Sequence, residues 1–329
     1  MALVQVRDIT KQFPVKGGIL QRTVASVNAV AGVDLDIDEG ETVGLVGESG
    51  CGKTTLARMM VRLLEPSSGS MEFDGTDVTH LSGRDLGTFR QNVQYIFQDP
   101  YASLDPRTTV GNSISEGLRI HHIGDAKGRR RRVHRMLEMV GLSSHHAERY
   151  PHEFSGGQRQ RIGIARALIL EPRFVVADEP VSALDVSVQA QVLNLLRDLQ
   201  TELRLTLLFV AHNLAVVEHI SDRVAVMYLG RIVELAGRDS LYANPVHPYT
   251  EALLSAIPIP DPTRKRHRQI LEGEIPSPLD PPPGCHFHPR CPIAQPGLCD
   301  VEDPRLAATK EPDHQAACLL RSGDRALST

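Results

Sequence analysis

The feature that most constrains this 329-residue chain is the segment Gly-Glu-Ser-Gly-Cys-Gly-Lys-Thr-Thr at residues 47–55, which fits the phosphate-loop pattern G-x-x-x-x-G-K-[ST]. Glycine has no Cβ, so Gly50 and Gly52 let the backbone turn its N–H groups inward. These groups meet phosphate oxygens at a helix N-terminus, where the helix dipole favours an anion. Residues 42–46 read as the buried strand before the loop, and residues 55–61 read as the helix after it. A chance glycine loop would lack this context.

The side chains of the loop complete a nucleotide site. Lys53 places a point charge on the β- and γ-phosphates, and Thr54 offers a hydroxyl to Mg²⁺. Phe13 follows the first predicted strand, at residues 3–9, and is either a ring that stacks on the base or an ordinary surface or core phenylalanine. The residues expected to bind ATP in this part of the chain are Phe13, Gly47, Ser49, Gly50, Cys51, Gly52, Lys53, Thr54 and Thr55.

Composition limits the class of protein. The chain is 41% hydrophobic and 23% charged, which is typical of a soluble globular protein. A net charge of -4 argues against a nucleic-acid binder by bulk charge. The basic run at residues 129–132, with Arg135, is either a solvated helix face or a nucleic-acid patch, and the net charge favours the solvated face. The chain has no apolar run long enough for a membrane span and no N-terminal signal segment, so we expect a cytoplasmic location.

A second candidate anion site lies about a hundred residues after the phosphate loop. Residues 154–158, Phe-Ser-Gly-Gly-Gln, precede a helical pattern at residues 159–170. Ser155 is a suitable N-cap, and the two glycines after it expose the N–H groups of the first helical turn. Alone, such a short string is a weak signal, but it stands just before the next motif.

Three further strands end in polar side chains. The apolar run at residues 174–177 reads as a strand buried on both faces and ends in Asp178 and Glu179. Asp178 can hold Mg²⁺ through water, and Glu179 can polarise the attacking water. The strands at residues 93–97 and 206–211 end at Gln98 and His212. Since ligands bind beyond the carboxyl ends of parallel strands, we expect these groups and the phosphate loop to form one catalytic site.

These residues, in this order, resemble the ATP-binding-cassette family over residues 3 to about 237. Residues 154–158 look like its signature motif, with Phe where Leu is commoner, and residues 182–185 look like its D-loop, which ends at Asp185. Asn213 departs from the family pattern, in which Asp commonly follows the switch histidine. The remaining motif equivalents are Gln98 for the Q-loop, Asp178 and Glu179 for the Walker B end, and His212 for the switch histidine.

The resemblance implies an α/β fold, a P-loop NTPase of the ABC type with a parallel sheet core, an antiparallel β subdomain and an inserted helical subdomain at about residues 99–165. The ATPase domain would cover residues 1–237, and residues 238–329 would form a small C-terminal extension that contains cysteines. Two such domains would face head to tail, so that the signature residues of one act in trans on the nucleotide of the other. Those residues are Ser155, Gly156, Gly157 and Gln158. By the same resemblance, Glu179, His212 and Gln98 are catalytic, and Thr54, Gln98 and Asp178 hold Mg²⁺.

Finer features resemble the ATPases of dipeptide and oligopeptide importers. These features lie at residues 98–107 and 244–254. Within this group, residues 13–18 and 257–262 look most like the second of the two ATPase subunits. The implied partners are two transmembrane permease subunits, a second and paralogous ATPase subunit, and an extracytoplasmic substrate-binding protein, with Tyr101 and the helical region near the permeases. The implied location is peripheral, on the cytoplasmic face of the inner membrane. Nickel chelates and glutathione remain possible solutes besides peptides.

Four of the five cysteines follow proline-rich stretches at residues 258–262 and 276–283, which read as stiff linkers. This segment is too small for a large core, so a metal would supply the missing stability. The spacing lacks the paired C-x-x-C of common zinc sites, and the resemblance favours a [4Fe–4S] cluster, with zinc or unligated thiols as alternatives. His286, His288 and His314 are expected at the surface rather than as ligands. The proposed cluster ligands are Cys285, Cys291, Cys299 and Cys318.

Two other functions stay open at this point. One is a cassette ATPase that acts on nucleic acid or ribosomes, although such proteins tend to carry tandem cassettes, long insertions or basic arms, and the chain has one cassette. The other makes the cysteine segment a redox or metal sensor that controls the ATPase, which is compatible with transport.

Overall fold

The strands that end in the polar motifs pair with one another in a single sheet. The computed structural model describes residues 2–17, 22–99, 104–257, 271–311 and 313–322, so Tyr101 and the predicted linker at residues 258–262 lie outside it. The sheet has eight strands in the order β11-β12-β10-β9-β3-β8-β7-β6. Its parallel part consists of β9 (Arg223–Tyr228), β3 (Thr42–Val46), β8 (Thr206–Ala211), β7 (Phe174–Asp178) and β6 (Val93–Ile96). β3, β7 and β8 are buried along their whole length, as the continuous apolar runs predicted.

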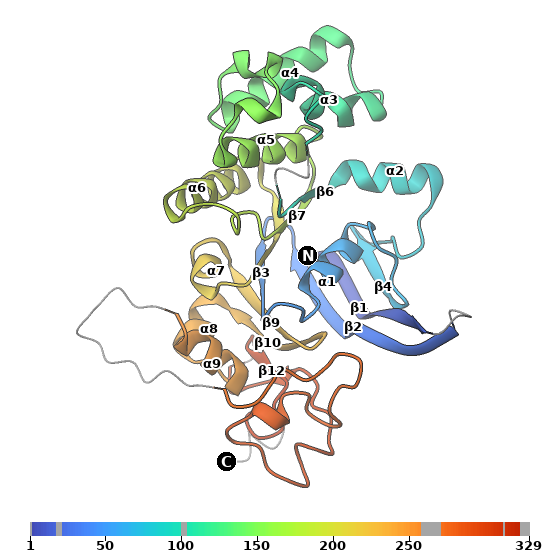
Figure 1. The fold of residues 1–329 in the computed structure, drawn as a ribbon, viewed down its shortest axis with the longest axis vertical. Coiled ribbons are helices and arrows are strands. Elements are labelled where there is room, and N and C mark those ends of the chain that lie inside the picture. Colours follow the sequence, from blue (N-terminus) through green and yellow to red (C-terminus); the bar gives the residue numbers. More distant parts are fainter. Residues whose placement is uncertain (1, 18–21, 100–103, 258–270, 312, 323–329) are drawn as a thin grey trace, which may run out of the picture.

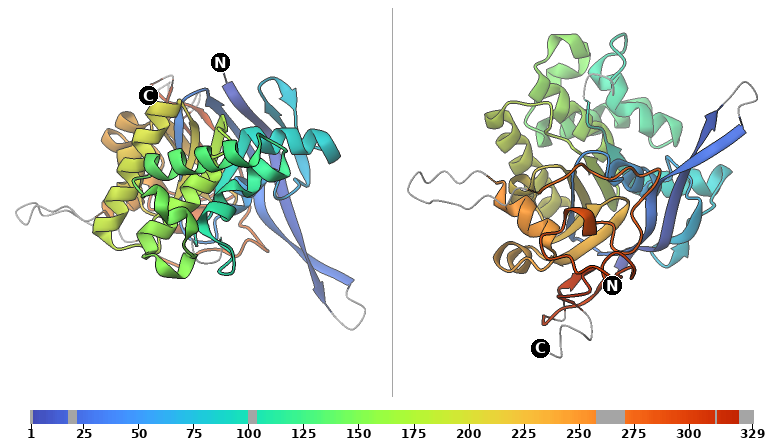
Figure 2. Two further views of the ribbon diagram at one scale, coloured as in Figure 1. Left: turned by 90° about the horizontal axis from the view of Figure 1, so that it is seen from above. Right: turned by 60° about the horizontal axis from the view of Figure 1, so that its bottom comes forward.

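A second, antiparallel sheet has the order β2-β1-β4-β5 and confirms the predicted β subdomain. It consists of β1 (Ala2–Gly17), β2 (Arg22–Asp38), β4 (Ser68–Phe73) and β5 (Thr76–Asp77). β1 and β2 form a long hairpin that projects from the body of the molecule (Figures 1 and 2). The strand prediction ended too early here. Phe13 lies within β1, opposite Val27, and β1 continues to Gly17, because ladder pairing with β2 holds this stretch extended.

The helices divide between the sheet and a separate layer. α3 (Val110–Ile120), α4 (Ala126–Met139) and α5 (Gly156–Leu168) lie together at the end of the molecule remote from the C-terminus (Figure 1). The basic run is mostly exposed on α4, and Arg130 pairs there with Glu148, as expected of a solvated face. The remaining helices are α1 (Lys53–Met60), α2 (Gly83–Asn92), α6 (Val186–Leu203), α7 (Leu214–Ile220), α8 (Arg238–Ala243) and α9 (Pro248–Ser255).

α1 and α5 both begin earlier than the apolar periodicity predicted, because each starts at its glycine-rich cap. Among the helices that the structure describes, none has the length and apolar character needed to cross a bilayer.

The C-terminal extension is more closely joined to the cassette than the sequence indicated. β12 (Gln315–Ala316) pairs with β10 (Arg231–Gly237) and β11 (Ala307–Ala308), so the main sheet continues into the extension (Figures 1 and 2). Phe287 is 1% exposed and belongs to the main hydrophobic core. The extension therefore draws on the core of the cassette for stability and does not depend on a metal alone. Its predicted boundary at residue 238 coincides with the start of α8, while the division into two domains stays a prediction.

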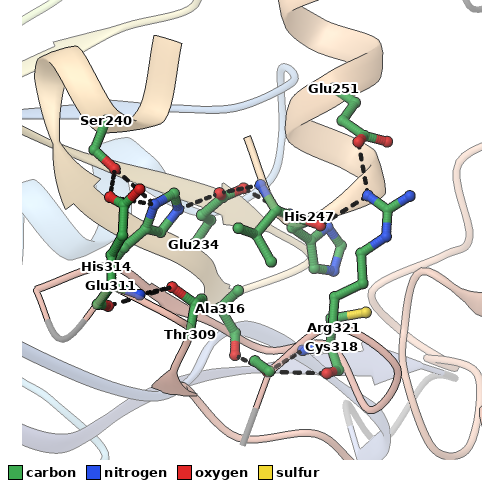
Figure 3. A network of polar contacts seen from close by, with 12 residues as sticks. Glu234, Ser240, His247, Glu251, Thr309, Glu311, His314, Ala316, Cys318 and Arg321 are labelled. Carbon is green, nitrogen blue, oxygen red and sulfur yellow. Dashed lines mark hydrogen bonds and ion pairs between the residues drawn. The ribbon is translucent and has the colours of Figure 1, made fainter. Parts of the chain in front are cut away.

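A buried carboxylate holds the extension in place (Figure 3). Glu234, on β10, is fully buried, and its carboxylate accepts hydrogen bonds from the backbone N–H groups of Val246 (2.7 Å) and His247 (3.0 Å). His314 Nε2 lies 2.6 Å from the same carboxylate, and Ser240 Oγ lies 2.9 Å from His314 Nδ1. The expectation that His314 is at the surface was wrong, since it is 2% exposed. A buried carboxylate needs such partners, and they come from segments on both sides of α9.

We predict that His314→Ala lowers the free energy of unfolding by about 2 kcal/mol, because a hydrogen bond to a charged group contributes about 1.5–3 kcal/mol and its loss leaves a buried carboxylate less satisfied. Urea unfolding of the full chain measures the change, with the exposed Glu202→Gln as a control. Equal stability of His314→Ala and the control would show that the pair does not hold the extension.

Candidate functional site

The phosphate loop joins β3 to α1 and packs tightly against the backbone of Met227 and Ala29. A Cβ at Gly47 would clash with the carbonyl oxygen of Met227, and one at Gly52 would clash with that of Ala29. Gly52 also has a φ of 108°, a conformation that other residues rarely adopt. Lys53 is buried, and its Nζ donates to the carbonyl oxygens of Gly47 (2.8 Å) and Glu48 (3.0 Å). The loop thus folds around the side chain of Lys53, as expected of a loop that binds phosphate.

Asp178, at the end of β7, is the second element of the site. It is 2% exposed, and its Oδ1 accepts a hydrogen bond of 3.1 Å from Thr54 Oγ1. Its Oδ2 accepts a hydrogen bond of 2.6 Å from the hydroxyl of Tyr95, on the neighbouring strand β6. Burial, followed by the hydrogen bond with Asp178, raises the pKa of Tyr95, so its hydroxyl stays a donor at neutral pH. The carboxylate is therefore oriented toward the hydroxyl expected to bind Mg²⁺.

Tyr95 was not among the site residues predicted from the sequence. Its position in β6 is informative only after the order of the strands is known, because the contact depends on β6 lying next to β7. The signal in the sequence was a tyrosine three residues before Gln98 on a strand that ends at the site.

Glu179, the next residue, meets both of the other polar strand ends. Its Oε2 accepts a hydrogen bond of 3.0 Å from Gln98 Nε2 and lies 3.4 Å from His212 Nδ1. Glu179 has a φ of 45°, in the left-handed region that costs a residue with a side chain of order 1–3 kcal/mol. Its backbone N–H donates to the carbonyl oxygen of Val210 at 2.9 Å, which helps to hold this conformation. The strand ends therefore converge at one edge of the sheet.

The second glycine motif caps α5 with two reciprocal hydrogen bonds. Ser155 Oγ accepts from the N–H of Gln158 (3.3 Å), and Gln158 Oε1 accepts from the N–H of Ser155 (3.1 Å). This capping box confirms Ser155 as the N-cap. Gly157 packs against Val188 of α6, where a Cβ would clash, and Gly156 lies near Leu184.

Other predicted residues lie apart from the phosphate loop. Among the described residues, no hydrogen bond or ion pair joins residues 155–158 to residues 47–55. Asp185 is exposed at the N-cap of α6. Phe13 is 40% exposed, and Lys11 Nζ lies over its ring, 5.4 Å from the centroid. Ser49 and Gly50 are also exposed, at the tip of the loop.

The four C-terminal cysteines lie near one another as thiols that form no disulfide. Burial, with a smaller contribution from the other three thiols, raises the pKa of Cys285 to about 11. Burial likewise raises the pKa of Cys291 and Cys318. Within the described part of the chain, no group of three or more His, Cys, Asp or Glu side chains is arranged to hold a metal ion. The thiols are thus gathered but do not form the compact tetrahedral set of a zinc site.

Comparisons with known proteins agree with this geometry. Residues 30–182 match the family model "ABC transporter", and residues 233–299 match "Oligopeptide/dipeptide transporter, C-terminal region". The oligopeptide transport ATP-binding protein AppF of Bacillus subtilis is 52% identical over 326 residues, which cover 97% of this chain and 98% of AppF. The chain belongs to the family of ABC transporter ATP-binding proteins. It is an ATPase coupled to transport, as the resemblance implied.

Solved structures support the same fold. The dimeric ATP-binding cassette MJ0796 in a post-hydrolysis state bound to ADP and phosphate has a TM-score of 0.63 and 29% identity, and the match covers 71% of this chain and 98% of MJ0796. The cbiO1 protein from Clostridium perfringens, part of the ABC transporter complex cbiONQ, has a TM-score of 0.64 and 27% identity, with 74% and 91% covered. The predicted ABC-type P-loop NTPase fold is confirmed.

We predict that Tyr95→Phe raises the Mg²⁺ concentration needed for half-maximal nucleotide binding about 10-fold. This is the lower end of the effect expected when a group that orients a metal ligand is lost. A Mg²⁺ titration of nucleotide binding measures the effect. Tyr242→Phe is the matched control, because it removes another partly buried hydroxyl, which donates to the carbonyl oxygen of Leu214 away from the site. The same Mg²⁺ dependence in both variants would exclude an orienting role for Tyr95.

Proposed function

We propose that this chain is the ATP-hydrolysing subunit that powers the import of dipeptides and oligopeptides. The observation that carries the proposal is the match of residues 233–299 to the C-terminal region of oligopeptide and dipeptide transporters, together with the full-length similarity to AppF. Because the match extends across both the cassette and the extension, it argues against a cassette that acts on nucleic acid or ribosomes. Within this class, we assign the chain to the second ATPase subunit type.

The site residues then have the following roles. The phosphate loop and Lys53 bind the triphosphate, Phe13 stacks on the base, and Thr54, Gln98 and Asp178 hold Mg²⁺. Glu179 acts as the general base on the attacking water. His212, 3.4 Å from the Glu179 carboxylate, positions that base, and Gln98 reports the state of the γ-phosphate. The contact of Gln98 and His212 with one carboxylate oxygen supports a shared role.

The signature residues 155–158 act on the nucleotide of a second, paralogous ATPase subunit. Two features support this arrangement. The N-terminus of α5 is capped and its cap is exposed, so its N–H dipoles can meet an anion from outside the chain. The dimeric cassette MJ0796 has the same fold as this chain. Asp185, exposed beside this motif at the start of α6, would face the partner as well.

A cleft next to Gln98 fits a segment of the two membrane-spanning permease subunits. It has a volume of about 190 Å³ and lies between β6 and α5, with Phe97, Gln160 and Arg166 in its lining. Phe97 is 44% exposed and directly precedes Gln98, so a segment in this cleft would sense movement of the Q-loop. The subunit would then work at the cytoplasmic face of the inner membrane, with an extracytoplasmic protein delivering the solute.

We also propose that the four thiols of Cys285, Cys291, Cys299 and Cys318 hold a [4Fe–4S] cluster. The proposal is supported by the interaction of the other three thiols with Cys285, since [4Fe–4S] clusters are held by four cysteine thiolates. Cys299 and Cys318 are buried and Cys285 and Cys291 are half-buried. The Cys285 N–H donates to the carbonyl oxygen of Cys299 at 2.8 Å, which ties two of the proposed ligands together.

The transport proposal is tested in liposomes that contain the chain with its co-purified membrane subunits and binding protein. We expect a mixture of di- and oligopeptides to stimulate ATP hydrolysis severalfold. Glu179→Gln should slow hydrolysis about 10²–10⁴-fold and leave ATP binding intact, because it removes only the base. Stimulation by a nickel chelate or glutathione, with none by peptides, would refute the peptide assignment. Near-normal turnover of Glu179→Gln would remove Glu179 from the role of base.

The cluster proposal is tested by iron, sulfide and zinc analysis of protein purified without oxygen. About four irons per chain are expected for one [4Fe–4S] cluster, with loss of iron in Cys299→Ser. Protein with zinc in place of iron, or with neither metal, would contradict the proposal.

A further inference from the structure

An ion pair joins the cysteine-containing extension to the phosphate loop. Arg290, in the short 3-10 helix His288–Arg290, donates to both carboxylate oxygens of Glu48, at 2.9 and 3.3 Å. Glu48 is the second residue of the phosphate loop, so the pair spans 242 positions of the sequence. The two side chains are 7% and 27% exposed, and a two-pronged arginine–carboxylate contact of this kind holds its partner in one orientation.

The backbone of Glu48 is held as well. Its N–H donates to the hydroxyl oxygen of Tyr249, on α9, at 2.9 Å. Its carbonyl oxygen accepts from Lys53 Nζ at 3.0 Å. Side chain, N–H and C=O of one loop residue thus each have a partner, and two of the three partners come from the segment after residue 238.

The residues that hold Glu48 rest on a rigid aromatic platform. The ring of Tyr249 lies 4.8 Å from that of Tyr228 and 5.5 Å from that of Phe287, measured between centroids. Arg290 lies 6.0 Å from the centroid of Tyr228. All three rings are buried, and Met227, next to Tyr228, is the residue that leaves no room for a Cβ at Gly47. The platform therefore supports the loop from the side of the C-terminal extension.

We propose that Arg290 and Tyr249 are positioning residues for nucleotide binding, through which the C-terminal extension preorganises the phosphate loop. A loop that is already ordered loses less conformational entropy when ATP binds, so its affinity is higher. When Lys53 turns from the Glu48 carbonyl to a phosphate, Arg290 and Tyr249 keep Glu48 in place. The inference rests on the established ATPase activity, and it does not depend on the transported solute or on a cluster.

The test is the affinity of the full-length chain for Mg²⁺–ATP, measured by calorimetry, and the turnover number of the assembled transporter. For Arg290→Ala we expect Kd and KM for ATP to rise about 10-fold, equivalent to about 1.4 kcal/mol, with turnover at saturating ATP within about twofold of wild type. Arg290→Lys retains the charge but loses the two-pronged contact, so it should recover only part of the affinity. Tyr249→Phe removes only the acceptor for the Glu48 N–H and should raise Kd about threefold.

Arg231→Ala is the matched control, because Arg231 forms another ion pair between the cassette and the extension, with Asp303, and does not contact the loop. It should lower the melting temperature and leave the ATP affinity unchanged. A double-mutant cycle with Glu48→Ala adds a second criterion, since Arg290→Ala should have little further effect once Glu48 is truncated.

Two results would overturn the proposal. One is an unchanged Kd in Arg290→Ala with a melting temperature lowered as in Arg231→Ala, which would make the pair a structural link alone. The other is a cycle in which the effects of Arg290→Ala and Glu48→Ala on Kd simply add. Should Arg290→Ala not fold, Tyr249→Phe decides the matter, because a wild-type Kd in that variant would equally contradict the proposal.

Discussion

The conformation of the phosphate loop is restricted by the backbone that packs against it. The carbonyl groups of Met227 and Ala29 occupy the space where Gly47 and Gly52 would otherwise carry side chains. Gly230 N–H also donates to the carbonyl oxygen of Cys51 at 2.8 Å, which ties the loop to the turn between β9 and β10. A loop with this support has few alternative conformations, so its amides can face an anion before the anion arrives. Tyr228, the last residue of β9 before this turn, packs against Phe287 of the extension.

The parallel sheet then determines which chemical groups surround the loop. β3, β8, β7 and β6 are neighbours, and each ends at the same edge in a polar residue or in the loop itself. At that edge the left-handed backbone of Glu179 aims one carboxylate at Gln98 and His212, while Asp178 faces Thr54. The adjacent carboxylates of Asp178 and Glu179 thereby have different surroundings. Such a difference would suit Asp178 to hold a metal and Glu179 to accept a proton.

Much of this could be predicted from the sequence, because it depends on local signals. The glycine loop, the apolar runs and their polar ends are each contained in fewer than ten residues, so each can be recognised before the order of the strands is known. The contacts of Tyr95, Glu234 and Arg290 could not be predicted, because each depends on how distant segments pack. His314 is the clearest case, since a histidine in a loop-rich segment gives no sign that it lies beside a buried carboxylate 80 positions away. Arg290 immediately precedes Cys291, so the thiols lie one residue from the contact with the phosphate loop.

The central claim is that contacts with the rest of the chain order the phosphate loop before nucleotide binds. The most direct test is hydrogen exchange of the individual loop amides, measured by NMR in the full-length chain. The account predicts that the Glu48 amide, which donates to Tyr249, exchanges slowly without nucleotide and changes little when Mg²⁺–ATP is added. The amides of Gly50 and Gly52 should slow markedly only after that addition. A Glu48 amide that exchanges as fast as that of Gly50 until ATP binds would contradict the account.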